Sequence, residues 1–176
     1  MRNGSALVSA IVSAVLRTVA NLVAKSRSDD GIASDTKLPP QQRITSAVKS
    51  AMSKSSNRDM LKITSLQFSD TSDGQLLATV RFAIDDNFTE GFIRHFAKSE
   101  IRMTLQKMME FNIPFGVVSF EGTMSMSDVK GNTSEIIVVE AKYPRTELDG
   151  VNWGNFLTDN VYEIADSVYL HPKFQD

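Results

Sequence analysis

A regular alternation of side chains over residues 76–84 is the feature that most constrains how this chain can fold. Every second position is apolar: Leu76, Ala78, Val80, Phe82 and Ile84. Because successive side chains of a strand point to opposite faces of a sheet, this period of two predicts a β-strand. A strand with one apolar face needs partner strands and a covering layer, which restricts the chain to a sheet-containing fold.

The same reasoning predicts three further strands, and a period of 3.6 residues predicts three helices. In chain order these are a helix over 43–54, strands over 61–68 and 76–84, a helix over 87–111, strands over 118–127 and 137–143, and a helix over 152–170. The polar turns 70–74 and 128–132 join the strands as two hairpins. A slip near Ser65 suggests a bulge, and Asn87 followed by Glu90 predicts a capped start for the long helix.

The order of elements is therefore α-β-β-α-β-β-α, which predicts an α+β fold. We expect a four-stranded antiparallel sheet, made of the two hairpins, with helices on one face. The sequence divides into a hydrophobic N-terminal helix over 1–24, a polar flexible linker over 25–42 and a single domain over 43–176. The linker composition offers too few apolar side chains to offset the entropy of ordering it.

Residues 6–24 are mostly apolar, and four polar residues, Ser9, Ser13, Arg17 and Asn21, recur at steps of four along one helical stripe. A helix of this length would measure about 28 Å, close to the thickness of a bilayer's hydrocarbon core. Three interpretations stay open: a membrane-spanning helix, a signal peptide, or an amphipathic helix that packs on protein. The first two place the protein at a membrane or outside the cytoplasm, and the third is compatible with the cytoplasm.

The net charge of −2 conceals an uneven distribution of charge along the chain. Residues 1–58 carry a balance of +6, whereas residues 59–176 carry −8. An acidic domain repels a phosphate backbone, so we do not expect nucleic-acid binding. The chain contains no cysteine, which excludes disulfides, thiolate nucleophiles, iron–sulfur clusters and cysteine-based zinc sites.

The residue patterns indicate no catalytic residue and no cofactor. For a metal ion they offer only Asp159, Glu163 and Asp166, whose spacing would align three carboxylates on one face of the last helix. A solvated acidic face explains the same spacing, and we adopt that interpretation. His95 lies opposite the apolar stripe of its helix and is expected at the surface, whereas His171 is expected to cap the end of the last helix.

Several short motifs resemble a group of uncharacterised proteins of Gram-positive bacteria, their phages and mobile elements. These motifs are Asp86-Asn87-Phe88-Thr89, Met126-Ser127-Asp128 with Gly131-Asn132, Val151-Asn152-Trp153-Gly154-Asn155-Phe156, and Ile164-Ala165-Asp166 with His171-Pro172-Lys173-Phe174. Members of that group are often membrane-tethered or lipoprotein-like, with a polar linker before the domain. The resemblance spans Lys62 to Phe174, implies a tethered layout and supplies no activity. It fails at the N-terminus, where a lipidated cysteine is missing.

The sequence thus favours a non-catalytic binding or interaction module that is membrane-tethered or exported. Its partner would be a protein or a small molecule, the membrane contact would run through residues 6–24, and the chain could form a homo-oligomer. The alternative is a structural or assembly subunit of a phage or another multi-protein complex. An enzyme that uses carboxylates such as Asp128 or Asp166 is a distant third.

Overall fold

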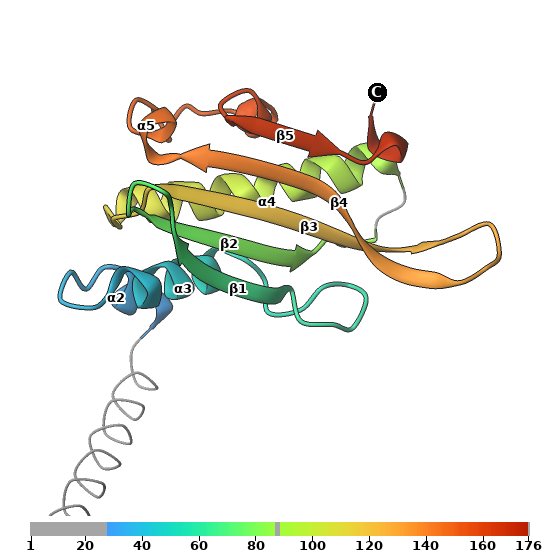
Figure 1. Cartoon of the computed structure of the whole chain (residues 1–176), viewed down its shortest axis with the longest axis horizontal. Helices are drawn as coiled ribbons and strands as arrows, with labels where there is room; N and C mark the ends of the chain where they lie inside the picture. Colours follow the sequence, from blue (N-terminus) through green and yellow to red (C-terminus); the bar gives the residue numbers. More distant parts are fainter. Residues whose placement is uncertain (1–27, 87–88, 176) are drawn as a thin grey trace, which may run out of the picture.

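A computed structural model describes residues 28–86 and 89–175 of the chain (Figure 1). Its elements are α2 (Asp29–Ala33), α3 (Pro40–Ala51), β1 (Ile63–Asp70), β2 (Leu76–Ala83), α4 (Glu90–Glu110), β3 (Val117–Ser127), β4 (Thr133–Pro144), α5 (Arg145–Leu148), η1 (Thr158–Tyr162), β5 (Ser167–Leu170) and η2 (Pro172–Phe174). The N-terminal helix predicted over 1–24 lies outside the described residues. No helix within the described ranges is both long enough and apolar enough to span a membrane.

The fold is α+β, built on a five-stranded mixed sheet in the order β1-β2-β3-β4-β5. The predicted four-stranded antiparallel sheet is wrong in one pairing, because β2 and β3 run parallel while the other neighbours are antiparallel. The physical reason is the connection between them. Helix α4 carries the chain from the end of β2 back to the start of β3, and a crossover of this kind places consecutive strands side by side in the same direction.

The helix predicted over 152–170 is also wrong. This segment forms the short 3₁₀ helix η1 followed by β5, in which Val168 pairs with Ala141 and Tyr169 with Glu140 of β4. The residues of β5 are Ser-Val-Tyr-Leu, and β-branched and aromatic residues favour strands. Pairing with the edge of β4 therefore prevails over the helical spacing of the apolar residues.

Much of the segment predicted to be a flexible linker is folded. Ser28 caps α2 by accepting a hydrogen bond from the Gly31 N–H, and Pro40 occupies the first turn of α3, where its lack of an N–H costs nothing. Arg43 of α3 connects this helix to α2 and to the end of α4. Its Nε donates to the carbonyl of Ala33 in α2 (2.8 Å), and its Nη2 donates to the carbonyl of Phe111, which follows α4 (2.6 Å). These contacts order a segment whose composition alone would leave it unfolded.

The core lies between one face of the sheet and the helices. Alternate residues of the central strands point into it and are fully buried, among them Val80, Phe82, Val118 and Phe120. Helix α4 runs behind β3 and β4, and no helix of the described residues is drawn over the opposite face of the sheet (Figure 1). The long β3–β4 hairpin extends beyond the end of the sheet at the right of that view.

Two local predictions are confirmed and one is corrected. The register shifts between Ile63 and Ser65, as the bulge predicts, and a tight hairpin turn at 128–132 contains Gly131 with φ 82°. The long helix is capped by Thr89, whose hydroxyl accepts a hydrogen bond from the Phe92 N–H at 3.3 Å, and not by Asn87, which lies outside the described residues.

Candidate functional site

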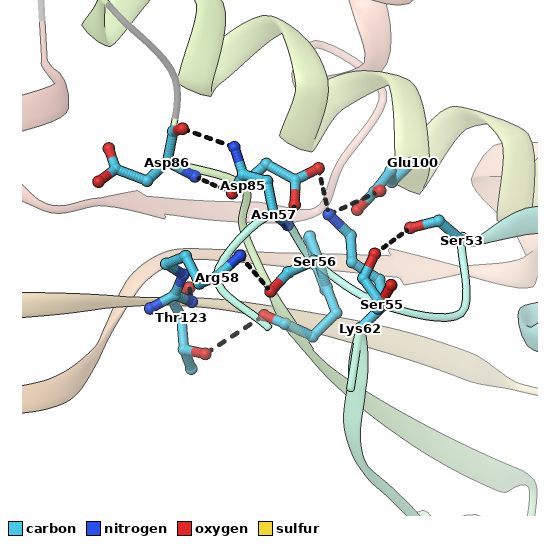
Figure 2. Close-up of polar contacts among 11 residues, drawn as sticks. Ser53, Ser55, Ser56, Asn57, Arg58, Lys62, Asp85, Asp86, Glu100 and Thr123 are labelled. Carbon is cyan, nitrogen blue, oxygen red and sulfur yellow. Dashed lines mark hydrogen bonds and ion pairs between the residues drawn. The ribbon is translucent and has the colours of Figure 1, made fainter. Parts of the chain in front are cut away.

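The most unusual group of side chains in the described part of the molecule surrounds a buried lysine. Lys62 precedes β1, Asp85 follows β2, and Glu100 lies in the middle of α4. The Lys62 ammonium is 3.0 Å from Asp85 Oδ2 and 2.8 Å from Glu100 Oε1, and only 1% of the Lys62 side chain is exposed. Figure 2 shows Lys62 reaching between the two carboxylates, and we term these three residues the Lys62 cluster.

Asn57 links the loop before β1 to the Lys62 cluster and to Asp86, the residue that follows Asp85. Its backbone N–H donates to Asp85 Oδ1 at 2.9 Å. Its side chain exchanges two hydrogen bonds with the backbone of Asp86, donating from Nδ2 to the carbonyl (2.6 Å) and accepting at Oδ1 from the N–H (2.9 Å). This reciprocal pair imitates the bonding of two strands, so the loop is anchored to the segment that leads into α4 (Figure 2).

Arg58 connects this loop to the β3–β4 hairpin. Its Nη1 is 2.6 Å from Glu135 Oε1, and its Nη2 donates to the Thr123 carbonyl at 3.3 Å. Residues 57–62 of the loop before β1 therefore hold this loop against the end of β2 and the β3–β4 hairpin. Local hydrogen bonding of this density limits the ways in which the loop can move.

Burial dominates the electrostatics of the Lys62 cluster. Loss of solvent raises the pKa of the Glu100 carboxyl, while the hydrogen bond and charge of Lys62 oppose that shift. Glu100 Oε2 has no hydrogen-bond partner among the described residues. Because the ammonium is enclosed and held by two carboxylates, it offers no nucleophile to a dissolved substrate. The cluster joins three chain segments in the manner of a buried structural ion network.

The structure separates the three carboxylates that the sequence placed on one helical face. Asp159 lies in η1 with 78% of its side chain exposed, Glu163 caps the end of η1, and Asp166 precedes β5. The helix that would have aligned them does not form. Within residues 28–86 and 89–175, no set of three or more His, Asp or Glu side chains is arranged to hold a metal ion.

The two histidines lie at the surface or at a helix end. His95 is exposed as predicted, and its Nδ1 is 3.9 Å from Asp159 Oδ1. His171 does cap a helix, but it is the N-cap of η2, where its Nδ1 accepts a hydrogen bond from the Lys173 N–H at 3.3 Å. The predicted role at the end of a long last helix is wrong because that helix is replaced by β5.

Helix α4 carries an apolar stripe on its outer surface. Phe92, Phe96 and Met103 are 58%, 43% and 38% exposed, and they lie on the side of the helix opposite the buried Ile101 and Leu105. Aromatic side chains and methionine are enriched in protein interfaces, so this stripe is the described surface best suited to contact a protein.

The side of α4 next to the C-terminal segment is occupied by cations at steps of four residues. Arg94 donates to the Phe174 carbonyl, Lys98 to the Asp159 carbonyl and Arg102 to the Trp153 and Phe156 carbonyls, at 3.0–3.2 Å. These bonds attach the irregular segment 151–175 to the helix. They also explain how a segment with little regular structure keeps a defined position.

The sequence analysis did not identify the three residues of the Lys62 cluster as partners. In the sequence Lys62 stands within the first predicted strand and Asp85 directly after the second, and nothing in their spacing indicates that they are partners. The partners of Lys62 are 23 and 38 residues away along the chain, so only the tertiary fold brings them together.

Searches of protein-family models, of curated proteins and of solved structures found no match to this chain.

Proposed function

We propose that the chain is a non-catalytic interaction module that its hydrophobic N-terminal segment tethers to a membrane or directs for export. The observation that carries the proposal is the outer stripe of α4, where Phe92, Phe96 and Met103 are exposed on a helix whose opposite side is buried in the core. Exposed apolar groups cost free energy in water, and a contiguous set of them marks an interaction surface.

The ordering of the chain around α4 supports this proposal. Lys62 and Glu100 fix one side of the helix, and Arg102 fixes the other through two carbonyls. A helix held on both sides presents its outer residues in a fixed arrangement, so little conformational entropy is lost when a partner binds. The partner that such a stripe suits is a protein with an apolar groove or helix face.

The hydrophobic segment 6–24 and the resemblance of the domain to tethered proteins support the location. In this arrangement the segment holds the domain at a membrane, and the outer stripe of α4 remains available to a second protein. Catalysis has no role in the proposal, because the buried charges of the described region are used to join chain segments.

Site-specific photocross-linking tests the binding surface. A photoreactive phenylalanine analogue placed at Phe96 in the full chain should give discrete adducts with a partner protein after irradiation in cells. The same analogue at Ser125, which is exposed on the β3–β4 hairpin away from α4, serves as the matched control. Adducts specific to Phe96 support the proposal. Equal, non-specific labelling from both positions contradicts it.

A further inference from the structure

An apolar groove with a basic rim lies between α2, α3 and the start of β1. It has a volume of about 380 Å³ and is lined by Asp29, Lys49, Ser53, Lys54, Leu61 and Ile63. Leu61 is 72% exposed at this groove, although a leucine at the surface costs free energy. Two lysines against one aspartate give the rim a net positive charge. We term this surface the basic groove.

A second surface has the complementary character. Leu157, immediately before η1, is 65% exposed, and it is followed by the exposed carboxylates of Asp159 and Glu163. Lys98 Nζ and His95 Nδ1 each lie 3.9 Å from Asp159 Oδ1, at the long end of ion-pair distances, and Lys98 also donates to the Asp159 carbonyl. We term Leu157, Asp159 and Glu163 the acidic edge. Like the basic groove, it combines one exposed leucine with two exposed charged side chains, here of opposite sign.

The two surfaces lie at opposite edges of the described sheet. The basic groove borders β1 and the acidic edge precedes β5, which are the two edge strands of the described sheet (Figure 1). Helix α4 connects the two surfaces, because Lys62, between the groove residues Leu61 and Ile63, contacts Glu100, and Lys98 contacts Asp159.

The directions of the edge strands are compatible with side-by-side addition of a second copy. β1 is antiparallel to β2, β2 is parallel to β3, and β4 is antiparallel to both β3 and β5. β5 therefore runs opposite to β1. A second copy placed beside the first in the same orientation brings its β5 next to β1 in the antiparallel sense, and an unpaired edge strand is a template for such addition.

We propose that copies of this chain associate head to tail, with the acidic edge of one copy seated in the basic groove of the next. Leu157 then enters the groove beside Leu61, and Asp159 and Glu163 meet Lys49 and Lys54. The contact joins two different surfaces, so it is heterologous and produces a ring or a filament. The inference uses surfaces other than the outer stripe of α4, so it goes beyond the proposed interaction module and names a second copy of the chain as an additional partner. A contact that repeats from copy to copy is also what a structural or assembly subunit requires.

Charge reversal tests the contact because the two surfaces can be changed separately. Lys49→Glu with Lys54→Glu makes the groove acidic, and Asp159→Lys with Glu163→Lys makes the edge basic. All four side chains are exposed, so the variants should keep the fold, which circular dichroism checks. Sedimentation velocity of the full chain in mild detergent measures association. Every variant retains residues 1–27, so self-association through that segment is the same in all of them.

The expected pattern is specific to a heterologous contact. The unaltered chain associates as its concentration rises, and each double variant sediments as a smaller species because like charges now face each other. An equimolar mixture of the two double variants associates again, as does one chain carrying all four changes. Added salt weakens the association, because the rim charges are exposed and are screened.

Two results would overturn the inference. One is an unaltered chain that stays monomeric over the whole concentration range, and the other is association that neither charge reversal changes. A monomeric chain that still gives specific cross-links from Phe96 would remove the self-association and leave the interaction module intact. Failure of both experiments would remove both proposals.

Discussion

The Lys62 ammonium lies 2.8 Å from the Glu100 carboxylate and is almost completely withdrawn from solvent. This contact joins the start of β1 to the middle of α4, and the second carboxylate, Asp85, adds the end of β2. Because desolvation of charges is expensive, such a network is stable only while every member has its partner. It therefore controls how firmly α4, with its outer apolar stripe, is held against the sheet.

Removal of the lysine charge should destabilise the fold strongly. Lys62→Met leaves two carboxylates near one another without their cation, and we expect a loss of about 3–5 kcal/mol in the free energy of unfolding. Urea denaturation followed by circular dichroism measures it. Lys130→Met, a change to an exposed lysine in the turn between β3 and β4, should stay within about 0.5 kcal/mol of the unaltered chain. A Lys62→Met chain as stable as this control would contradict the account.

The pH dependence of stability should report the burial of Glu100. Burial raises the pKa of this carboxyl, so the folded state holds its proton at a pH where the unfolded state has released it. The stability that Glu100 contributes is thus complete below the unfolded pKa of about 4.3 and is lost as pH rises through the folded pKa. The free energy of unfolding of the unaltered chain minus that of the Glu100→Gln chain should therefore decrease from pH 4 to pH 7. A difference that grows with pH would contradict this assignment.

The order of α2 should depend on Arg43. This side chain is 3% exposed, and it donates to the carbonyl of Ala33 in α2 and to that of Phe111 at the end of α4. Arg43→Met removes the donor from a buried carbonyl (Ala33) and from a partly buried one (Phe111), so we expect a loss of about 3 kcal/mol. We also expect faster amide hydrogen exchange over 29–33. Gln42→Met, at the exposed neighbouring position, is the control. Unchanged exchange in α2 would show that Arg43 does not hold it.

Gly122 should tolerate no side chain. A Cβ at this position would lie 2.6 Å from Ile84 Cδ1 and 3.1 Å from its Cγ1, and Ile84 is itself buried. Gly122→Ala should cost about 1–3 kcal/mol by overpacking, and Ile84→Val in the same chain should recover part of that loss. Gly150→Ala, where a Cβ meets no atom within 4 Å, is the matched control. Equal stabilities of the Gly122 and Gly150 variants would contradict the packing.

The elements that the sequence predicted well are those whose own periodicity decides their structure. β2 and α4 each carry a long, regular apolar pattern, and the hairpin turn at 128–132 contains the glycine that a positive φ requires. The parallel pairing of β2 and β3 was missed because alternation specifies a strand but not its neighbours. β5 was missed because its four residues are held by β4 and not by a pattern of their own.

The candidate site was less accessible from the sequence. Lys62, Asp85 and Glu100 are ordinary residues at unrelated positions, and only the fold makes them a buried network. The acidic residues Asp159 and Glu163 were noted for their helical spacing, yet their surroundings in the structure give them a different meaning, as the rim of an exposed leucine. Surface character of this kind depends on which segments become neighbours.

Flotation with lipid vesicles tests the proposed tethered module most directly. The full chain and a chain lacking residues 1–24 are each incubated with phosphatidylcholine–phosphatidylglycerol vesicles and separated on a density gradient. We expect the full chain to float with the vesicles in high salt and to be released by detergent, whereas the shortened chain stays at the bottom in a folded state. A shortened chain that floats as well as the full one, or a full chain that does not float, would contradict the account.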